Sequence, residues 1–145
     1  MRTQAQYARL QLHGAHYLIP STLGLVIEQR DALQPNTEGG NVTAWRTQHE
    51  TRWPAYSLDR AFKLTQRKQW QRALFLDAGA DSVGVIVDEV QMLARADIQI
   101  SAFTPLGPPP ARDGHLFKGA WVEGRQATLV IDPQTFLAYL QGFGR

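Results

Sequence analysis

The sequence contains no cysteine, and this absence removes several classes of protein at once. Without thiols there is no disulfide framework, no thiolate zinc site and no cysteine nucleophile. Long apolar runs are missing too, because no segment reaches the length of a membrane span. The first twenty residues also lack the continuous apolar core of a signal peptide. We therefore expect a cytoplasmic protein.

The sequence also lacks a large excess of either charge, since its formal net charge is only +2 over 145 residues. The strong positive field that nucleic-acid-binding proteins usually carry is absent. Apolar residues make up 43% of the chain, which is enough for the core of one globular domain. Neither a phosphate-binding glycine loop nor a G-x-S-x-G motif is present. We therefore expect neither a hydrolase nor a P-loop nucleotide-binding protein, and we expect no cofactor.

The apolar pattern predicts a mostly β fold. Residues 7–12 alternate with the two-residue period of a half-buried strand. A type II′ loop at Gly14-Ala15 should return the chain into a second strand at 17–19. We expect further strands at 23–28, 42–46, 53–58, 72–77, 83–90 and 98–100, a hairpin over 115–132 that turns at Glu123-Gly124, and a helix from Pro133. Loops are expected at 34–41 and 105–114.

Residues 59–72 change character and are expected to form a short helix or helical turn. The segment carries basic side chains interleaved with Phe62 and Trp70, a combination that can hold phosphates and stack bases. The rival hypothesis is therefore a small basic β-domain that binds single-stranded nucleic acid through residues 60–72. A solvated linker explains the same charges, and the low net charge favours it.

His13 and His16 flank the expected two-residue loop and would be cross-strand neighbours. Two ligands at an exposed tip do not make a metal site, and no third ligand is evident. No metal is expected.

The run V-G-V-I-V-D-E-V at 83–90 ends in two adjacent carboxylates. Because neighbouring residues of a strand point to opposite faces, Asp88 and Glu89 cannot converge on one substrate atom as an acid and base. We interpret them as structural residues at the end of a strand.

The same run resembles the strand signature of the CheW-like chemotaxis adaptor family, G-[hydrophobic]3-D-x-V, at Gly84–Val90. The later segment L-F-K-G-A-W-V-E-G-R-Q-A-T-L-V-I-D-P-Q-T-F-L resembles the closing segment of that family. Positions that fit its pattern there are Gly119, Leu129, Ile131, Asp132 and Phe136.

Upstream, L-Q-L-H-G-A-H-Y-L-I-P resembles the opening hairpin, and V-T-A-W-R with W-P-A-Y-S-L resembles the segment G-V-x-N-L-R-G followed by P-V-x-D-L. This chain departs from that pattern, and its hairpin from Arg46 to Pro54 is longer. The departures are Asn41 and Thr47 for glycine, Ala44 for asparagine and Ser57 for aspartate.

The resemblance implies a CheW-like fold of two five-stranded SH3-like β-barrel subdomains with short connecting and C-terminal helices. We expect a single domain over 1–145, with a first subdomain at about 15–75 and a second at about 76–130. The N-terminal strand and the C-terminal helix would cross over between them. The implied function is a non-catalytic scaffold that couples a chemoreceptor, or another input protein, to a CheA-like histidine kinase in chemotaxis or pilus (twitching) motility.

The candidate partner-binding residues come from both implied subdomains. For each of them, packing in the core or in a hairpin is the alternative. The candidates are Leu23, Leu25, Trp45 and Arg46 in the first subdomain, and Val87, Asp88 and Val90 in the second.

Overall fold

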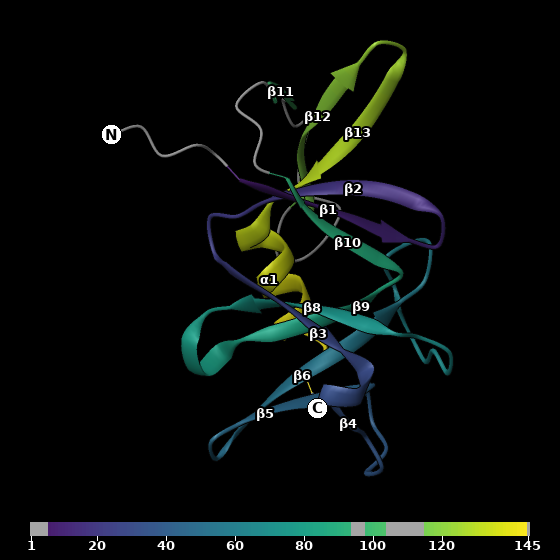
Figure 1. The fold of residues 1–145 in the computed structure, drawn as a ribbon, viewed down its shortest axis with the longest axis vertical. Coiled ribbons are helices and arrows are strands. Elements are labelled where there is room, and N and C mark those ends of the chain that lie inside the picture. Colours follow the sequence, from purple (N-terminus) through teal and green to yellow (C-terminus); the bar gives the residue numbers. More distant parts are fainter. Residues whose placement is uncertain (1–5, 94–97, 104–114, 145) are drawn as a thin grey trace.

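Two curled β-sheets and one helix make up the computed structural model, which describes residues 6–93, 98–103 and 115–144 (Figure 1). The helix α1 (Pro133–Gln141) lies where the two sheets meet. The expected mostly β class of fold is confirmed. Short one-turn 3-10 helices at Arg30–Ala32 and Gly79–Asp81 connect strands.

The first sheet, sheet A, has six strands in the order β10-β1-β2-β13-β12-β11. It therefore combines both ends of the described chain. Its strands are β1 (Tyr7–Leu12), β2 (Ala15–Pro20), β10 (Glu89–Leu93), β11 (Ile100–Ala102), β12 (Phe117–Glu123) and β13 (Gln126–Ile131).

The second sheet, sheet B, follows the order β3-β8-β9-β6-β5-β4, and β7 pairs with β6 off this path. Its strands come from one continuous stretch of the chain. They are β3 (Gly24–Gln29), β4 (Gln34–Pro35), β5 (Ala44–Gln48), β6 (Thr51–Leu58), β7 (Leu64–Thr65), β8 (Arg72–Asp77) and β9 (Val83–Val87).

Each sheet contains one parallel strand pair among otherwise antiparallel neighbours. In sheet A, β2 and β13 pair at Tyr17 and Leu129. In sheet B, β6 and β9 pair at Tyr56 and Val85. The two sheets thus share this pattern of strand pairing.

Sheet membership differs from the subdomain boundaries expected at 15–75 and 76–130. Strand β2 pairs with β1 and β13 of sheet A, and β9 pairs with β8 and β6 of sheet B. The chain passes from sheet B to sheet A at Asp88, between β9 and β10. This crossover was not located from the sequence, because residues 83–90 were expected to form a single strand that continues through Asp88.

The first hairpin turns one residue earlier than expected. The loop is His13-Gly14, with φ angles of 50° and 84°, and Leu12 pairs with Ala15. Two consecutive positive φ angles define a type I′ turn, whose twist suits a two-residue hairpin. The last hairpin turns at Gly124-Arg125, in this case one residue later than expected.

The expectation of a helix at 59–72 is wrong. Asp59 instead closes a tight turn, because its carboxylate accepts hydrogen bonds from the N–H groups of Ala61 and Lys63 at 2.8 and 3.0 Å. Phe62 has a φ of 62°, which no right-handed helix contains. Its ring and that of Trp70 also enter different core clusters, so their spacing did not reflect one helical face.

The main hydrophobic cluster lies between the sheets and takes residues from both of them and from α1. Asp132 caps α1 by accepting hydrogen bonds from the N–H groups of Gln134 and Thr135. Trp45 and Trp121 are both buried in the chain itself, at 4% and 8% exposure. The strand expected at 98–100 begins at Ile100, and the loop expected at 105–114 lies outside the described residues.

Candidate functional site

Asp88 lies at the crossover between the sheets and connects three segments. Its carboxylate forms an ion pair with Arg67 and accepts hydrogen bonds from the backbone N–H groups of His13 and Gly14. Its own N–H donates to Gln11 O at 2.8 Å, and its carbonyl accepts from Arg72 at 2.7 Å. The residue therefore fixes the first hairpin of sheet A to the end of sheet B.

Two opposing effects act on the pKa of Asp88. Partial burial raises this pKa, but the Arg67 guanidinium and the N–H groups of the hairpin turn lower it by more. The pKa of Asp88 consequently lies below its ordinary value. Glu89, by contrast, is exposed and pairs with Arg72 at 2.8 Å. The two carboxylates thus have separate partners, as the alternation of the strand predicts.

The apolar candidates on either side of Asp88 differ in exposure. Val87 is 1% exposed and belongs to the core between the sheets. Val90 is half-buried against the same core and pairs with Leu10 on β1. Of these two, only Val90 offers surface to a partner in the isolated chain.

Arg46 projects from β5 and is held by three neighbours. Its Nε donates to Glu28 Oε1 at 3.1 Å, its Nη1 donates to Gln48 Oε1 at 2.9 Å, and its guanidinium stacks 4.6 Å from the centre of the Trp53 ring. Glu28 is on β3, at the far end of the strand order from β5. The ion pair therefore joins the two sides of the curled sheet B.

Trp45, the neighbour of Arg46, faces the interior. Its indole Nε1 donates to Asn36 Oδ1 at 3.3 Å, and the guanidinium of Arg52 lies 4.1 Å from the ring centre. Buried tryptophans normally satisfy this N–H in such a way. The side chain contributes to packing and to the order of the preceding loop.

Leu23 directly precedes β3, an edge strand of sheet B, and Leu25 lies within it. Both are half-buried against the core between the sheets. The same strand exposes Ile27 at 36%, which sequence reasoning did not single out. An apolar edge strand presents unpaired N–H and C=O groups to which another chain can pair.

A second exposed apolar side chain marks the edge strand of sheet A. Met92 on β10 is 42% exposed and lies two residues after Val90. The alternation of β10 beyond the Asp-x-Val motif was the available signal for this residue. Leu23, Leu25 and Val90 pack on one core cluster, whereas Trp45 and Val87 lie inside it.

The residues that distinguish this chain from the family pattern have internal partners. The Ser57 side chain is fully buried, and its hydroxyl lies 2.7 Å from that of Thr43. Thr47 donates to Gln34 Oε1 at 3.2 Å, and the Asn41 amide donates to Phe143 O at 2.7 Å. The altered residues are therefore integrated into this fold.

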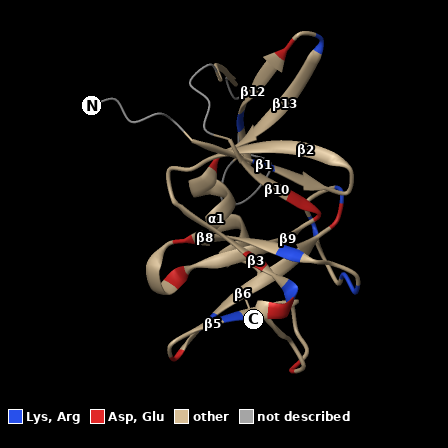
Figure 2. Cartoon of the chain, viewed as in Figure 1, with Lys and Arg blue, Asp and Glu red and all other residues tan. Residues whose placement is uncertain are grey.

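The basic segment 60–72 does not display the features that nucleic-acid stacking needs. Phe62 and Trp70 are buried at 8% and 6% exposure. Arg67 and Arg72 are paired with Asp88 and Glu89. Acidic and basic residues are interspersed over both sheets (Figure 2). The stacking part of the nucleic-acid hypothesis therefore lacks structural support.

The two histidines considered for metal binding are separated by the shifted turn. His13 Nε2 is hydrogen-bonded to Leu58 O at 2.7 Å, whereas His16 pairs with Gln11 across β1 and β2. Within the described part of the chain, no three His, Asp or Glu side chains are grouped so that they could hold a metal ion. In the same residues, no helix has the length and apolarity to span a membrane.

Comparison with known proteins identifies the fold. No protein-family model and no curated protein matches the sequence. Among solved structures, the chain is similar to the scaffolding protein TtCheW from Thermoanaerobacter tengcongensis. The TM-score is 0.62, the sequence identity is 15%, and the match covers 90% of each chain. The fold, two curled sheets with one helix where they meet, is that of a CheW scaffolding protein. The resemblance seen in the sequence is confirmed at the level of the fold, as for a divergent CheW-like chain.

Proposed function

We propose that this protein is a non-catalytic CheW-like adaptor in the cytoplasm. It would hold a CheA-like histidine kinase and a chemoreceptor, or another input protein, in a fixed geometry. The observation that carries the proposal is the fold match over 90% of both chains. In addition, the residues that carried the sequence resemblance occupy structurally demanding positions: Gly84 against Phe75, Asp88 at the crossover, Gly119 against Ser101 and Asp132 at the helix N-cap.

The partner-binding surface that we propose lies on the two edge strands, β3 and β10. Leu25 and Ile27 on β3, and Val90 and Met92 on β10, provide partly exposed apolar contacts. Leu23 extends the β3 side of this surface. Apolar anchors of this kind typically dominate the affinity of a protein interface, and charges at its rim set the register.

We assign Arg46 and Asp88 a mainly supporting role within this surface. Their charged groups already have partners inside the chain, in Glu28 and Arg67 respectively. Trp45 and Val87 support the surface from the core. Asn41 in the loop before β5 and Thr47 on β5, both altered from the family pattern, favour a specialised pathway, such as pilus motility, with an input protein different from an ordinary receptor.

The test compares binding to the CheA-like kinase and to chemoreceptor fragments from the same cell. Ile27→Glu places a charge on the proposed edge, whereas Val122→Glu places one on an exposed valine of the β12–β13 hairpin, 58% exposed, as a matched control. We expect Ile27→Glu to weaken binding about tenfold or more, while Val122→Glu binds like the wild type. Circular dichroism checks that both variants fold.

Two results would contradict the proposal. If the folded wild type binds neither kinase nor receptor, the fold has another use in this protein. If Ile27→Glu binds as well as Val122→Glu, the adaptor function stands and the proposed surface is wrong.

A further inference from the structure

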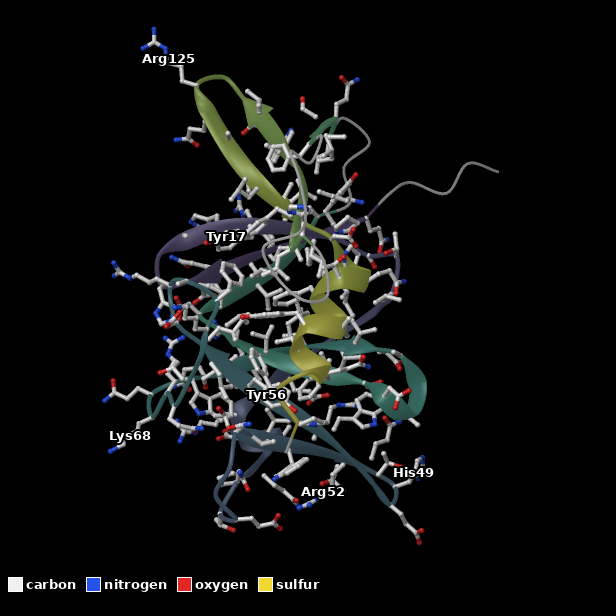
Figure 3. All side chains as sticks on the ribbon, turned by 180° about the vertical axis from the view of Figure 1, so that it is seen from behind. Tyr17, His49, Arg52, Tyr56, Lys68 and Arg125 are labelled. Carbon is white, nitrogen blue, oxygen red and sulfur yellow. The ribbon has the colours of Figure 1, made fainter. Side chains whose placement is uncertain are left out.

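The segment that follows α1 packs back onto sheet B. The Phe143 ring meets Tyr56 on β6 and Tyr139 on α1 edge to face, with ring centres 5.3 and 5.0 Å apart. Figure 3 shows Tyr56 beside the end of the helix. Three aromatic rings thus hold the chain at this point, and Phe143 is partly buried against the core between the sheets.

Two side chains, one from the loop before β5 and one from β6, also bind consecutive carbonyl groups of this segment. The Asn41 amide donates to Phe143 O at 2.7 Å, and the Tyr56 hydroxyl donates to Gly144 O at 2.6 Å. Both bonds run from a side chain to a backbone carbonyl, so they fix the position of the main chain of residues 142–144. We call this segment with its contacts the latch.

Asn41 belongs to the loop 36–43, which is ordered largely by one residue. The Asn36 amide donates to Gly39 O and Val42 O at 2.8 Å each, and its oxygen accepts from the Trp45 indole. The loop therefore connects the latch to Trp45, which precedes Arg46 on β5. A glycine at position 41, as the family pattern has, would provide no side-chain donor to Phe143.

We propose that the latch positions the loop 36–43 and thereby regulates partner binding at the β3–β5 side of sheet B. When residues 142–144 are seated, Asn41 is fixed, and the loop presents Trp45 and Arg46 in the geometry described above. When residues 142–144 are released, the loop loses the hydrogen bond from Asn41 to Phe143 O. The ion pair between Glu28 on β3 and Arg46 on β5 then becomes less ordered. The regulatory part of this inference rests on the proposed adaptor function.

The experiment measures hydrogen exchange of backbone amides on the complete, partner-free chain. Asn41→Asp replaces the donor by an acceptor that faces the Phe143 carbonyl, and Asn41→Ala removes the donor alone. Gln141→Ala is the matched control, because its side chain donates to Asp81 O at 2.8 Å and does not touch the loop. The protected amides that report on the loop are Asn36 and Thr43, which donate to Thr43 O and Ala55 O.

We expect exchange in residues 36–46 to become about fivefold faster in Asn41→Ala and faster still in Asn41→Asp. Exchange in β1 and β2 should be unchanged, and Gln141→Ala should leave the loop at the wild-type rate. Phe143→Ala should reproduce the effect. If that variant does not fold, the two Asn41 variants still decide the result. Equal exchange in Asn41→Asp and wild type would overturn the latch.

Binding is measured separately with the kinase and receptor fragments. Faster loop exchange together with weaker binding in Asn41→Asp, but not in Gln141→Ala, supports regulation by the latch. Faster exchange with unchanged binding overturns that regulation. If the wild type binds neither partner, the adaptor function is contradicted. The latch is not affected by that result, because hydrogen exchange is measured without a partner and tests the latch by itself.

Discussion

The ring of Phe75 on β8 fills the space in which any side chain on Gly84 would have to lie. A Cβ at Gly84 would come within 2.6 Å of Phe75 Cδ1, closer than any real contact of this kind. The two residues face each other across β8 and β9. The glycine that opens the Asp-x-Val signature is therefore required by packing in sheet B.

Gly84→Ala should lower the free energy of unfolding by about 1–3 kcal/mol, because the core must shift to admit the methyl group. Urea denaturation followed by tryptophan fluorescence measures this change. The double variant Phe75→Leu/Gly84→Ala should lose less stability than the sum of the two single changes. A Gly84→Ala protein as stable as the wild type would show that the ring moves aside without cost.

Asp88→Asn should destabilise the protein near neutral pH by about 1–2 kcal/mol, since the Arg67 ion pair and the charge-assisted bonds from the hairpin turn are weakened. The folded pKa of Asp88 is below the unfolded value, so the carboxylate stabilises the fold above the unfolded pKa. That stabilisation is lost as the pH falls through the folded pKa. The difference between wild type and variant should therefore shrink below about pH 4.

Chemical denaturation at neutral and at acidic pH tests this expectation. Glu89→Gln is the control, because Glu89 is 68% exposed and its ion pair with Arg72 should contribute little. A difference between wild type and Asp88→Asn that stays constant with pH would rule out a role for the charge.

Ser57→Asp, which restores the residue of the family pattern, should destabilise the fold by about 3 kcal/mol or more. The Ser57 side chain is completely buried, so a carboxylate there would lose its hydration. Ser57→Ala should cost only about 1 kcal/mol, because it leaves one hydroxyl, that of Thr43, without its 2.7 Å partner. Thermal denaturation ranks the two variants, and the reverse order would contradict this interpretation.

Arg46→Lys should not replace Arg46, because an ammonium group lacks the planar fork that bonds Glu28 and Gln48 while stacking on Trp53. We expect a loss of about 1 kcal/mol in stability for Arg46→Lys. Glu28→Gln should keep the stacking and lose less. Denaturation midpoints followed by tryptophan fluorescence test this, and full stability of Arg46→Lys would contradict a structural role for the guanidinium fork.

The strands could be predicted from the sequence because alternation and β-branched content are local signals. The apolar run 83–87 is buried on both faces, as its composition predicted. The helix after Asp132 follows from a capping residue before Pro133. These elements needed no knowledge of distant contacts.

The failures have non-local causes. The spacing of Phe62 and Trp70 resembled one helical face, but each ring fills a different core cluster. The partners of Arg46 and the burial of Trp45 depend on the curl of sheet B, which brings β3 to β5. Ile27 and Met92 were missed because their exposure depends on which strands form the sheet edges.

The distribution of the two sheets along the chain also has a consequence for folding. Every strand of sheet B lies within residues 24–87, so that sheet can assemble as soon as this stretch has left the ribosome. Sheet A cannot, because β2 pairs with β13, which is made much later, at Tyr17 and Leu129. Closing such distant pairs is slow, so the edge of β2 that faces β13 stays unpaired until β13 has been made. Strand β2 is thus made before sheet B but completes its pairing after it, and its open edge favours aggregation during that interval.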